Sequence, residues 1–198
     1  MKRPFALLLV VIALGVGVYF LFFRKEKEDR GPKDKPLGMV ENTGPFNQSF
    51  DKLLSAYFSV KEALVASDTA KANVAAAALV VASDSLKTEE IMGDSTGAIK
   101  ATAKDFAGTI SGSAKGLAGE IGIEAKRKEF EMISDALWSL TRTVKYAGQK
   151  VYYQYCPMAF DNKGAYWISN ERQIKNPYFG DKMLECGSIE DSLDYSQK

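Results

Sequence analysis

The chain has 198 residues, with 26 lysines and arginines against 25 aspartates and glutamates, so its formal net charge is +1. This balance, without a basic run interleaved with aromatic residues, predicts that the protein does not bind nucleic acid. The sequence contains no histidine, which excludes Ser-His-Asp and Cys-His catalysis and histidine-based zinc or haem sites. It also contains no P-loop or dinucleotide-binding glycine motif. We therefore expect a protein that is not an enzyme.

Residues 1–24 predict a signal-anchor transmembrane helix. The stretch from Pro4 to Phe23 carries no charge, and as a helix it would be about 30 Å long, the thickness of a bilayer core. Phe20 to Phe23 are bulky where a signal peptidase needs small residues, which favours an uncleaved anchor over a cleaved signal peptide. Residues 25–46 are charged and rich in proline and glycine, and we expect a flexible linker there.

Residues 47–187 predict four helices and a small C-terminal cap. Apolar residues recur at helical spacing in four segments separated by turn-forming residues. The first helix begins near Asn47 or Ser49 and ends before residues 67–69, the second runs to about Lys87, the third covers about 99–121, and the fourth covers 123–147. Their short connections favour an antiparallel up-and-down four-helix bundle. The expected fold class is therefore mainly α.

Three features of these helices carry expectations about their environment. Ala75 to Ala78 let helices approach closely, so the second helix is expected in the interior. The third helix has glycines at 108, 112, 116 and 119, which we attribute to tight packing against a neighbour. The basic run at residues 126–128 of the fourth helix is expected to face solvent.

The residues after the fourth helix predict a β-hairpin. Residues 151–155 and 165–169 have high β-propensity, and Asp161 to Gly164 form a turn between them. We expect the hairpin and its loops to cover the open end of the bundle. Residues 188–198 are expected to be a polar, frayed tail.

Both cysteines of the chain lie in this C-terminal stretch, and each has a methionine near it. Cys156 and Met158 are two residues apart and share a face of an extended strand, while Met183 and Cys186 are three apart and share a face of a helical turn. Thiolate and thioether are soft ligands that suit Cu(I) or Ag(I). One hypothesis is therefore a metal site formed by Cys156, Met158, Met183 and Cys186.

The competing hypothesis is a disulfide between Cys156 and Cys186. Two cysteines in one domain outside the cytoplasm usually pair, and this bond would stabilise the fold by about 3–4 kcal/mol in the chain-entropy model. Met158 and Met183 would then be ordinary hydrophobic residues. A pair that is oxidised at rest and binds copper when reduced would combine the two, and the sequence leaves these alternatives open.

Four short motifs in this stretch resemble the end of a bacterial domain-of-unknown-function family that is common in Bacteroidetes. They are Cys156-Pro157-Met158, the segment Gly164 to Ser169, the segment Asn176 to Gly180, and the segment Met183 to Gly187. The resemblance covers roughly residues 50–187. In that family the domain occurs alone behind an anchor, or as a C-terminal extension of copper/silver efflux periplasmic adaptor proteins.

The resemblance implies an extracytoplasmic domain with a link to copper and to components of metal-efflux adaptors. Together with the anchor and the charges of Lys2 and Arg3, it predicts a single-pass protein of the bacterial inner membrane whose C-terminal domain lies in the periplasm. The expected function is that of a membrane-anchored binding domain for Cu(I) or Ag(I). The alternative is a structural or interaction domain that is pinned by the disulfide and binds no metal.

Overall fold

The structure is a computed structural model and describes residues 41–196. The predicted anchor and most of the predicted linker lie outside these residues. Within 41–196 there is no helix whose length and apolar character would let it cross a membrane. The linker prediction is too long at its C-terminal end, because the short strand β1 (Glu41–Asn42) and the first turn of a helix already lie within residues 41–46.

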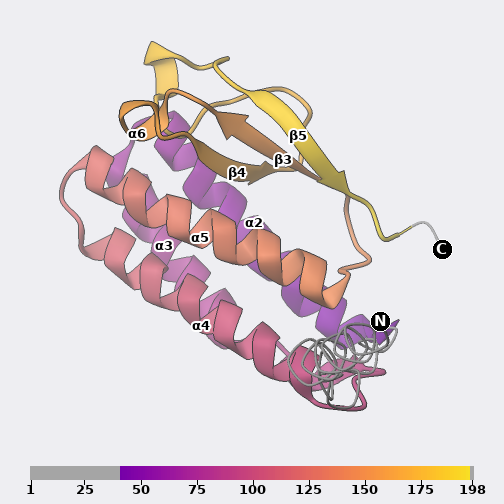
Figure 1. The fold of residues 1–198 in the computed structure, drawn as a ribbon. Helices are drawn as coiled ribbons and strands as arrows, with labels where there is room; N and C mark the ends of the chain where they lie inside the picture. The colour runs from indigo at the N-terminus through magenta and orange to yellow at the C-terminus, as the bar shows by residue number, and fades with distance from the viewer. Residues whose placement is uncertain (1–40, 197–198) are drawn as a thin grey trace, which may run out of the picture. The chain divides into compact units, whose positions relative to one another are not determined.

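Four long helices make up most of the domain: α2 (Gly44–Val65), α3 (Thr69–Asp84), α4 (Ala98–Gly119) and α5 (Ile123–Val144). Each packs against the next one in the sequence, and together the helices form a bundle (Figure 1). The prediction of a mainly helical fold is confirmed. Between α3 and α4, the 3₁₀ turn η1 (Thr88–Glu90) leads into β2 (Ile91–Met92), which pairs with β1.

The helix ends differ from the predicted ones for local reasons. Thr43 caps α2, its hydroxyl accepting from the Phe46 amide at 3.3 Å, and Pro45 lies in the first turn, where proline is tolerated. Asp68 caps α3 in the same way, through the Lys71 amide. The C-terminus of α5 lies beside the start of α2, and α5 stops at Lys145, which adopts a left-handed conformation (φ 47°), rather than at Gly148.

A three-stranded antiparallel sheet follows the helices. Its strands are β3 (Val151–Cys156), β4 (Ala165–Ser169) and β5 (Ser188–Leu193), in the order β4-β3-β5. The predicted hairpin of β3 and β4 is therefore confirmed, with Cys156 opposite Ala165. The prediction of a frayed tail is wrong for Ser188–Leu193, which form a strand whose side chains are largely exposed, so no apolar alternation marked it in the sequence.

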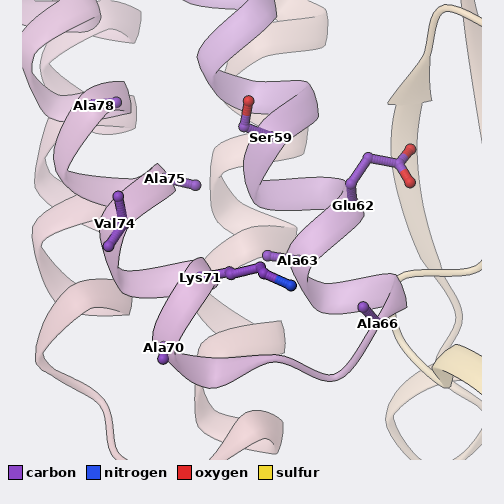
Figure 2. Close-up of a pocket in the computed structure, with 9 residues that line it drawn as sticks. All are labelled: Ser59, Glu62, Ala63, Ala66, Ala70, Lys71, Val74, Ala75 and Ala78. Carbon is purple, nitrogen blue, oxygen red and sulfur yellow. The ribbon is translucent and has the colours of Figure 1, made fainter.

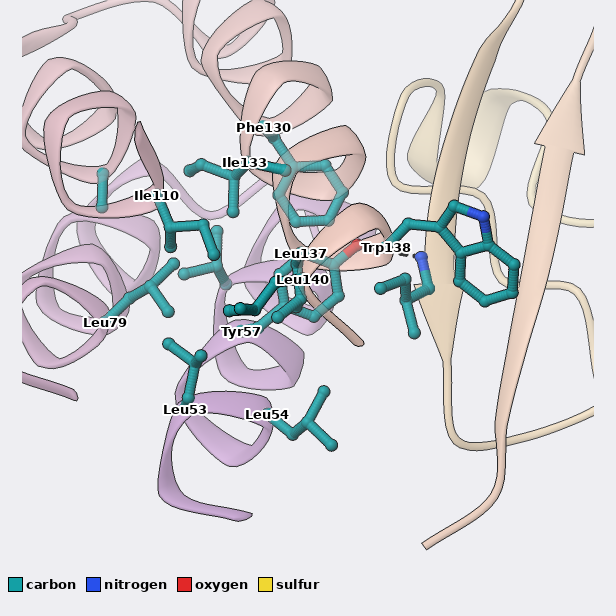
Figure 3. Packing of buried hydrophobic residues seen from close by; sticks show 14 of the residues in the cluster. Leu53, Leu54, Tyr57, Leu79, Ile110, Phe130, Ile133, Leu137, Trp138 and Leu140 are labelled. Carbon is teal, nitrogen blue, oxygen red and sulfur yellow. Dashed lines mark hydrogen bonds between the residues drawn. The ribbon is translucent and has the colours of Figure 1, made fainter. Parts of the chain in front are cut away.

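The sheet covers the seam between α2 and α5 along their sides, rather than the open end of the bundle. The hydroxyl of Tyr57 on α2 bonds to that of Ser134 on α5 at 2.8 Å and accepts the Ile168 amide of β4 at 3.0 Å. On the face of α5 that packs against the sheet, Trp138 stacks on Tyr153 of β3 with ring centroids 4.2 Å apart. Tyr57 thus joins both helices and the sheet at the centre of the core (Figure 3).

Two expectations about exposure are wrong. Only one face of α3 is interior, because Ala75 and Ala76 are buried while Val74 and Val81 are 74% and 65% exposed. In α5, Lys126 and Arg127 are buried, and only Lys128 of the basic run faces solvent. Both errors bear on the sections that follow.

The glycines of α4 do not mark a tight helix contact. No neighbouring group lies within 4 Å of a Cβ placed on Gly108, Gly112 or Gly119, and nothing in the structure explains these three glycines. Only at Gly116 would a Cβ meet another group, the Glu129 carboxyl carbon at 2.9 Å.

Alanine at Gly108 and Gly112 is therefore expected to stabilise the domain. Each substitution removes backbone freedom from the unfolded chain and should raise the free energy of unfolding by about 0.5–1 kcal/mol, as measured by urea denaturation. Gly116→Ala is the matched control, and its gain should be smaller because Glu129 must move. Equal gains at all three sites would contradict the packing described here.

Candidate functional site

The two cysteines meet at the end of β3. The Sγ atoms of Cys156 and Cys186 are 3.5 Å apart, and both residues are free thiols. Cys156 is fully buried, while Cys186 is partly exposed, so the pair connects the core with the surface. Of the four residues in the predicted sulfur site, these two are thus in direct contact.

Strand pairing brings Cys186 to this position. β5 runs antiparallel to β3, with Ser188 opposite Tyr155, so Cys186 approaches β3 just before that pairing begins. Gly187 lies between them at φ 150°, and a Cβ there would be 2.7 Å from the Tyr155 carbonyl oxygen and 2.9 Å from Cη2 of Trp167. A larger residue at position 187 would push the Cys186 segment away from β3.

Asn176 holds the same segment through two hydrogen bonds. Its side-chain amide donates to the Cys186 carbonyl oxygen at 2.7 Å, and its backbone N–H donates to the Leu184 carbonyl oxygen at 2.8 Å. Its side-chain oxygen accepts the Tyr178 amide at 2.8 Å. Asn176 is fully buried, so these bonds fix the loop that carries Cys186.

The two methionines of the predicted sulfur site differ in exposure. Met158 directly precedes the short helix α6 (Ala159–Asn162), and its side chain is 44% exposed. Met183 follows the 3₁₀ turn η2 (Gly180–Lys182) and is partly buried, and its carbonyl oxygen accepts the Cys186 amide at 3.1 Å. The structure therefore places Met183 in the turn that leads to Cys186, and it places Met158 on the surface.

The loop after Met158 has an unusual backbone. Phe160, Asp161 and Asn162 are consecutive non-glycine residues with φ of 52°, 58° and 66°. Left-handed backbone costs such residues about 1 kcal/mol or more each, and it persists only where the surroundings enforce it. Strained backbone of this kind clusters at functional sites, and here it begins four residues after Cys156.

Partial burial affects the protonation state of Cys186. It raises the pKa of Cys186, and the hydrogen bond and the charge interaction with Cys156 raise this pKa further. Cys186 is therefore a thiol at neutral pH, and a metal ion that binds it has to displace the proton. Within residues 41–196 there is no group of three or more histidine, cysteine, aspartate or glutamate side chains that could hold a metal ion.

Sequence reasoning missed the residues that support the thiol pair. Asn176 was named only as part of a motif of the family resemblance, although asparagine before proline favours a turn. Arg127 was assigned to the surface, yet its Nε donates to the Pro177 carbonyl oxygen at 2.9 Å and so anchors this loop to α5. Neither pairing has a signature within the local sequence.

The helical part of the chain is similar to a known family of domains. Residues 53–148 match the family model described as Protein of unknown function (DUF3347). The match runs from within α2 to just beyond α5 and ends before Cys156, so the motifs of the thiol site lie outside it. No curated protein and no solved structure matches the chain. The helical part of the protein is therefore similar to a domain of unknown function.

Proposed function

We propose that this protein is a non-catalytic, membrane-anchored extracytoplasmic domain that binds a soft metal ion, Cu(I) or Ag(I), through Cys156 and Cys186. The observation that carries the proposal is the 3.5 Å separation of the two Sγ atoms. A metal–thiolate bond of about 2.3 Å, the value for zinc, allows at most about 4.6 Å between two sulfurs on one ion. The pair can therefore bind one ion with little backbone movement.

The thioethers of Met158 and Met183 are the proposed additional ligands. Met183 is tied to Cys186 through the turn, and Met158 is two residues from Cys156 with an exposed side chain. A set of thiolates and thioethers selects soft ions over hard ones. An ion would enter from the solvent side, where Cys186 and Met158 are accessible.

The proposed setting is the periplasmic side of a bacterial inner membrane. The uncharged stretch from Pro4 to Phe23 supports a membrane anchor. The motifs around the two cysteines support a role in metal handling or efflux, with components of metal-efflux adaptors as partners. Neither the sequence nor the fold supports nucleic acid as a partner.

A competition titration with a Cu(I) chelator tests the metal site, using the reduced full chain in detergent under anaerobic conditions. We expect one Cu(I) per chain to be retained against the chelator and to be lost in Cys186→Ser. Met183→Leu should weaken binding, whereas Met132→Leu, which changes an exposed methionine on α5, should not. Binding that is absent in the wild type, or unchanged in Cys186→Ser, would contradict the proposal.

The same contact also favours a second candidate, a structural domain pinned by a Cys156–Cys186 disulfide. A disulfide needs a sulfur separation of about 2.05 Å, so thiols that already touch can be joined by a small side-chain movement. Intact mass with and without reductant, after alkylation of protein exported to the periplasm, separates the two. Alkylation of both thiols without reductant would rule out the disulfide.

A further inference from the structure

Helix α3 presents an apolar face to solvent. Val74 and Val81 are 74% and 65% exposed, and the small side chains between and beside them, Ala70, Ala77 and Ala78, are exposed as well. At 100° per residue these five positions fall on one side of the helix. The opposite side is buried against the bundle through Ala72, Ala76 and Leu79 among others. A helix that is apolar on all sides is normally covered on all sides.

A groove runs along this face between α2 and α3. It has a volume of about 670 Å³ and is open to solvent (Figure 2). Alanines from both helices form most of its wall, with Glu62 and Lys71 at the edge. The residues that line it are Ser59, Glu62, Ala63, Ala66, Ala70, Lys71, Val74, Ala75 and Ala78. Its apolar wall suits the apolar side chains of another helix.

The face is self-complementary when α3 is reversed. A twofold axis between residues 77 and 78 pairs Ala77 with Ala78, Val74 with Val81, and Lys71 with Asp84. The alanines at the crossing point allow close approach of two helix backbones, and the valines extend the apolar contact. The pairing of Lys71 with Asp84 places opposite charges at both ends of it.

We propose that α3 is a docking surface for a second copy of this chain, in an antiparallel α3–α3 pair about that axis. Such an interface is isologous, so each contact occurs twice. Val81 of the partner subunit would enter the groove beside Val74, and Lys71 would face the partner's Asp84. Both charges are available for this, because their pairs within the chain, Lys71–Asp68 and Asp84–Lys115, are exposed and exposed pairs are weak.

The expected dimer is weak in solution. One helix pair buries less than the roughly 800 Å² per partner of a stable interface. The proposed anchor would confine two copies to one membrane surface and raise their effective concentration. The association can thus be marginal in solution and substantial at the membrane.

Sedimentation velocity on residues 37–198, which contain all the described helices and strands, tests the proposal between about 10 μM and about 1 mM. We expect a concentration-dependent dimer that Val74→Glu abolishes. Met132→Glu is the matched control, since Met132 is a 54% exposed apolar residue on α5, and it should leave the dimer intact. A monomer at every concentration, or equal loss in both variants, overturns the proposal and assigns the groove to a different partner.

Charge reversal tests the register. Lys71→Glu and Asp84→Lys should each weaken the dimer roughly tenfold, because each creates two like-charge contacts across the axis. The double variant restores opposite charges and should return to within about threefold of the wild type. A double variant as weak as the single ones overturns the antiparallel register. Thermal melts of the single variants should match those of the wild type, since both positions are exposed.

Discussion

Replacing Arg127 with methionine is expected to lower the free energy of unfolding by about 2–4 kcal/mol. The buried guanidinium donates to the Pro177 carbonyl oxygen at 2.9 Å and to the Ser67 hydroxyl at 3.2 Å. It also donates to the buried Leu64 carbonyl oxygen at 3.4 Å and contacts the Glu124 carboxylate at 2.7 Å. Methionine fills the space of the stem but donates no hydrogen bond, so buried acceptors on two other segments lose their partner.

Urea denaturation followed by circular dichroism measures this loss. Lys128→Met is the matched control, because Lys128 is exposed on the same helix, and its effect should stay within about 0.5 kcal/mol. Arg127→Lys should fall between the two, since lysine keeps the charge but lacks the planar fork. A change in Arg127→Met as small as that in Lys128→Met would contradict the role assigned to Arg127.

The Arg127 variant should also affect the thiol site. Arg127 anchors the segment that contains Asn176 and Pro177, and Asn176 holds the Cys186 carbonyl oxygen. Loosening this segment should speed the alkylation of Cys186 in the folded protein. The alkylation rate of Cys186 therefore separates a local effect on the site from a general loss of stability. A Lys126 variant should lose stability without a faster alkylation of Cys186.

Replacing Lys126 with methionine is expected to cost about 2–3 kcal/mol. Its ammonium group donates to the carbonyl oxygens of Leu117 (2.7 Å) and Glu120 at the C-terminal end of α4, and to the side chain of Asn73 on α3. The last carbonyl oxygens of a helix have no partner within the helix and carry partial negative charge, so a buried cation satisfies both needs.

Thermal and urea denaturation measure the Lys126 effect against the same Lys128→Met control. The cost should be smaller than for Arg127, because Glu120 and Asn73 are exposed and water can replace part of what lysine supplies. Asn73→Ala should recover little of the loss when combined with Lys126→Met, since the acceptors on α4 remain unpaired. A stability equal to that of Lys128→Met would show that the α4 terminus needs no buried cation.

These two residues show why the sequence predicts some parts of this fold and not others. The apolar spacing of Phe130, Ile133 and Leu137 predicts α5 correctly, because the period of one helix is a local property. Whether Lys126 and Arg127 face water depends on which other segments lie beside the first turns of α5. These segments are the C-terminal ends of α4 and α2 and the loop after β4, and no local pattern encodes their position.

The same distinction applies to the candidate site. Composition alone singled out Cys156 and Cys186, since they are the only thiols of the chain. Their contact depends on β5, an exposed polar strand that carries no apolar alternation, and on the approach of Gly187 to Tyr155. The alanines of α3 led to a wrong prediction for a different reason, because a helix of small apolar residues shows no preferred buried face.

The two tryptophans of the chain occupy separate regions of the fold. Trp167 lies beside Gly187, next to the thiol pair, whereas Trp138 is stacked on Tyr153 where α5 meets the sheet. Their fluorescence can therefore report on two regions independently. With Trp138 replaced by phenylalanine, the remaining indole emission follows events around the cysteines, and with Trp167 replaced it follows the separation of sheet and helix. The protein thus carries intrinsic optical probes for both its site and its fold, without an added label.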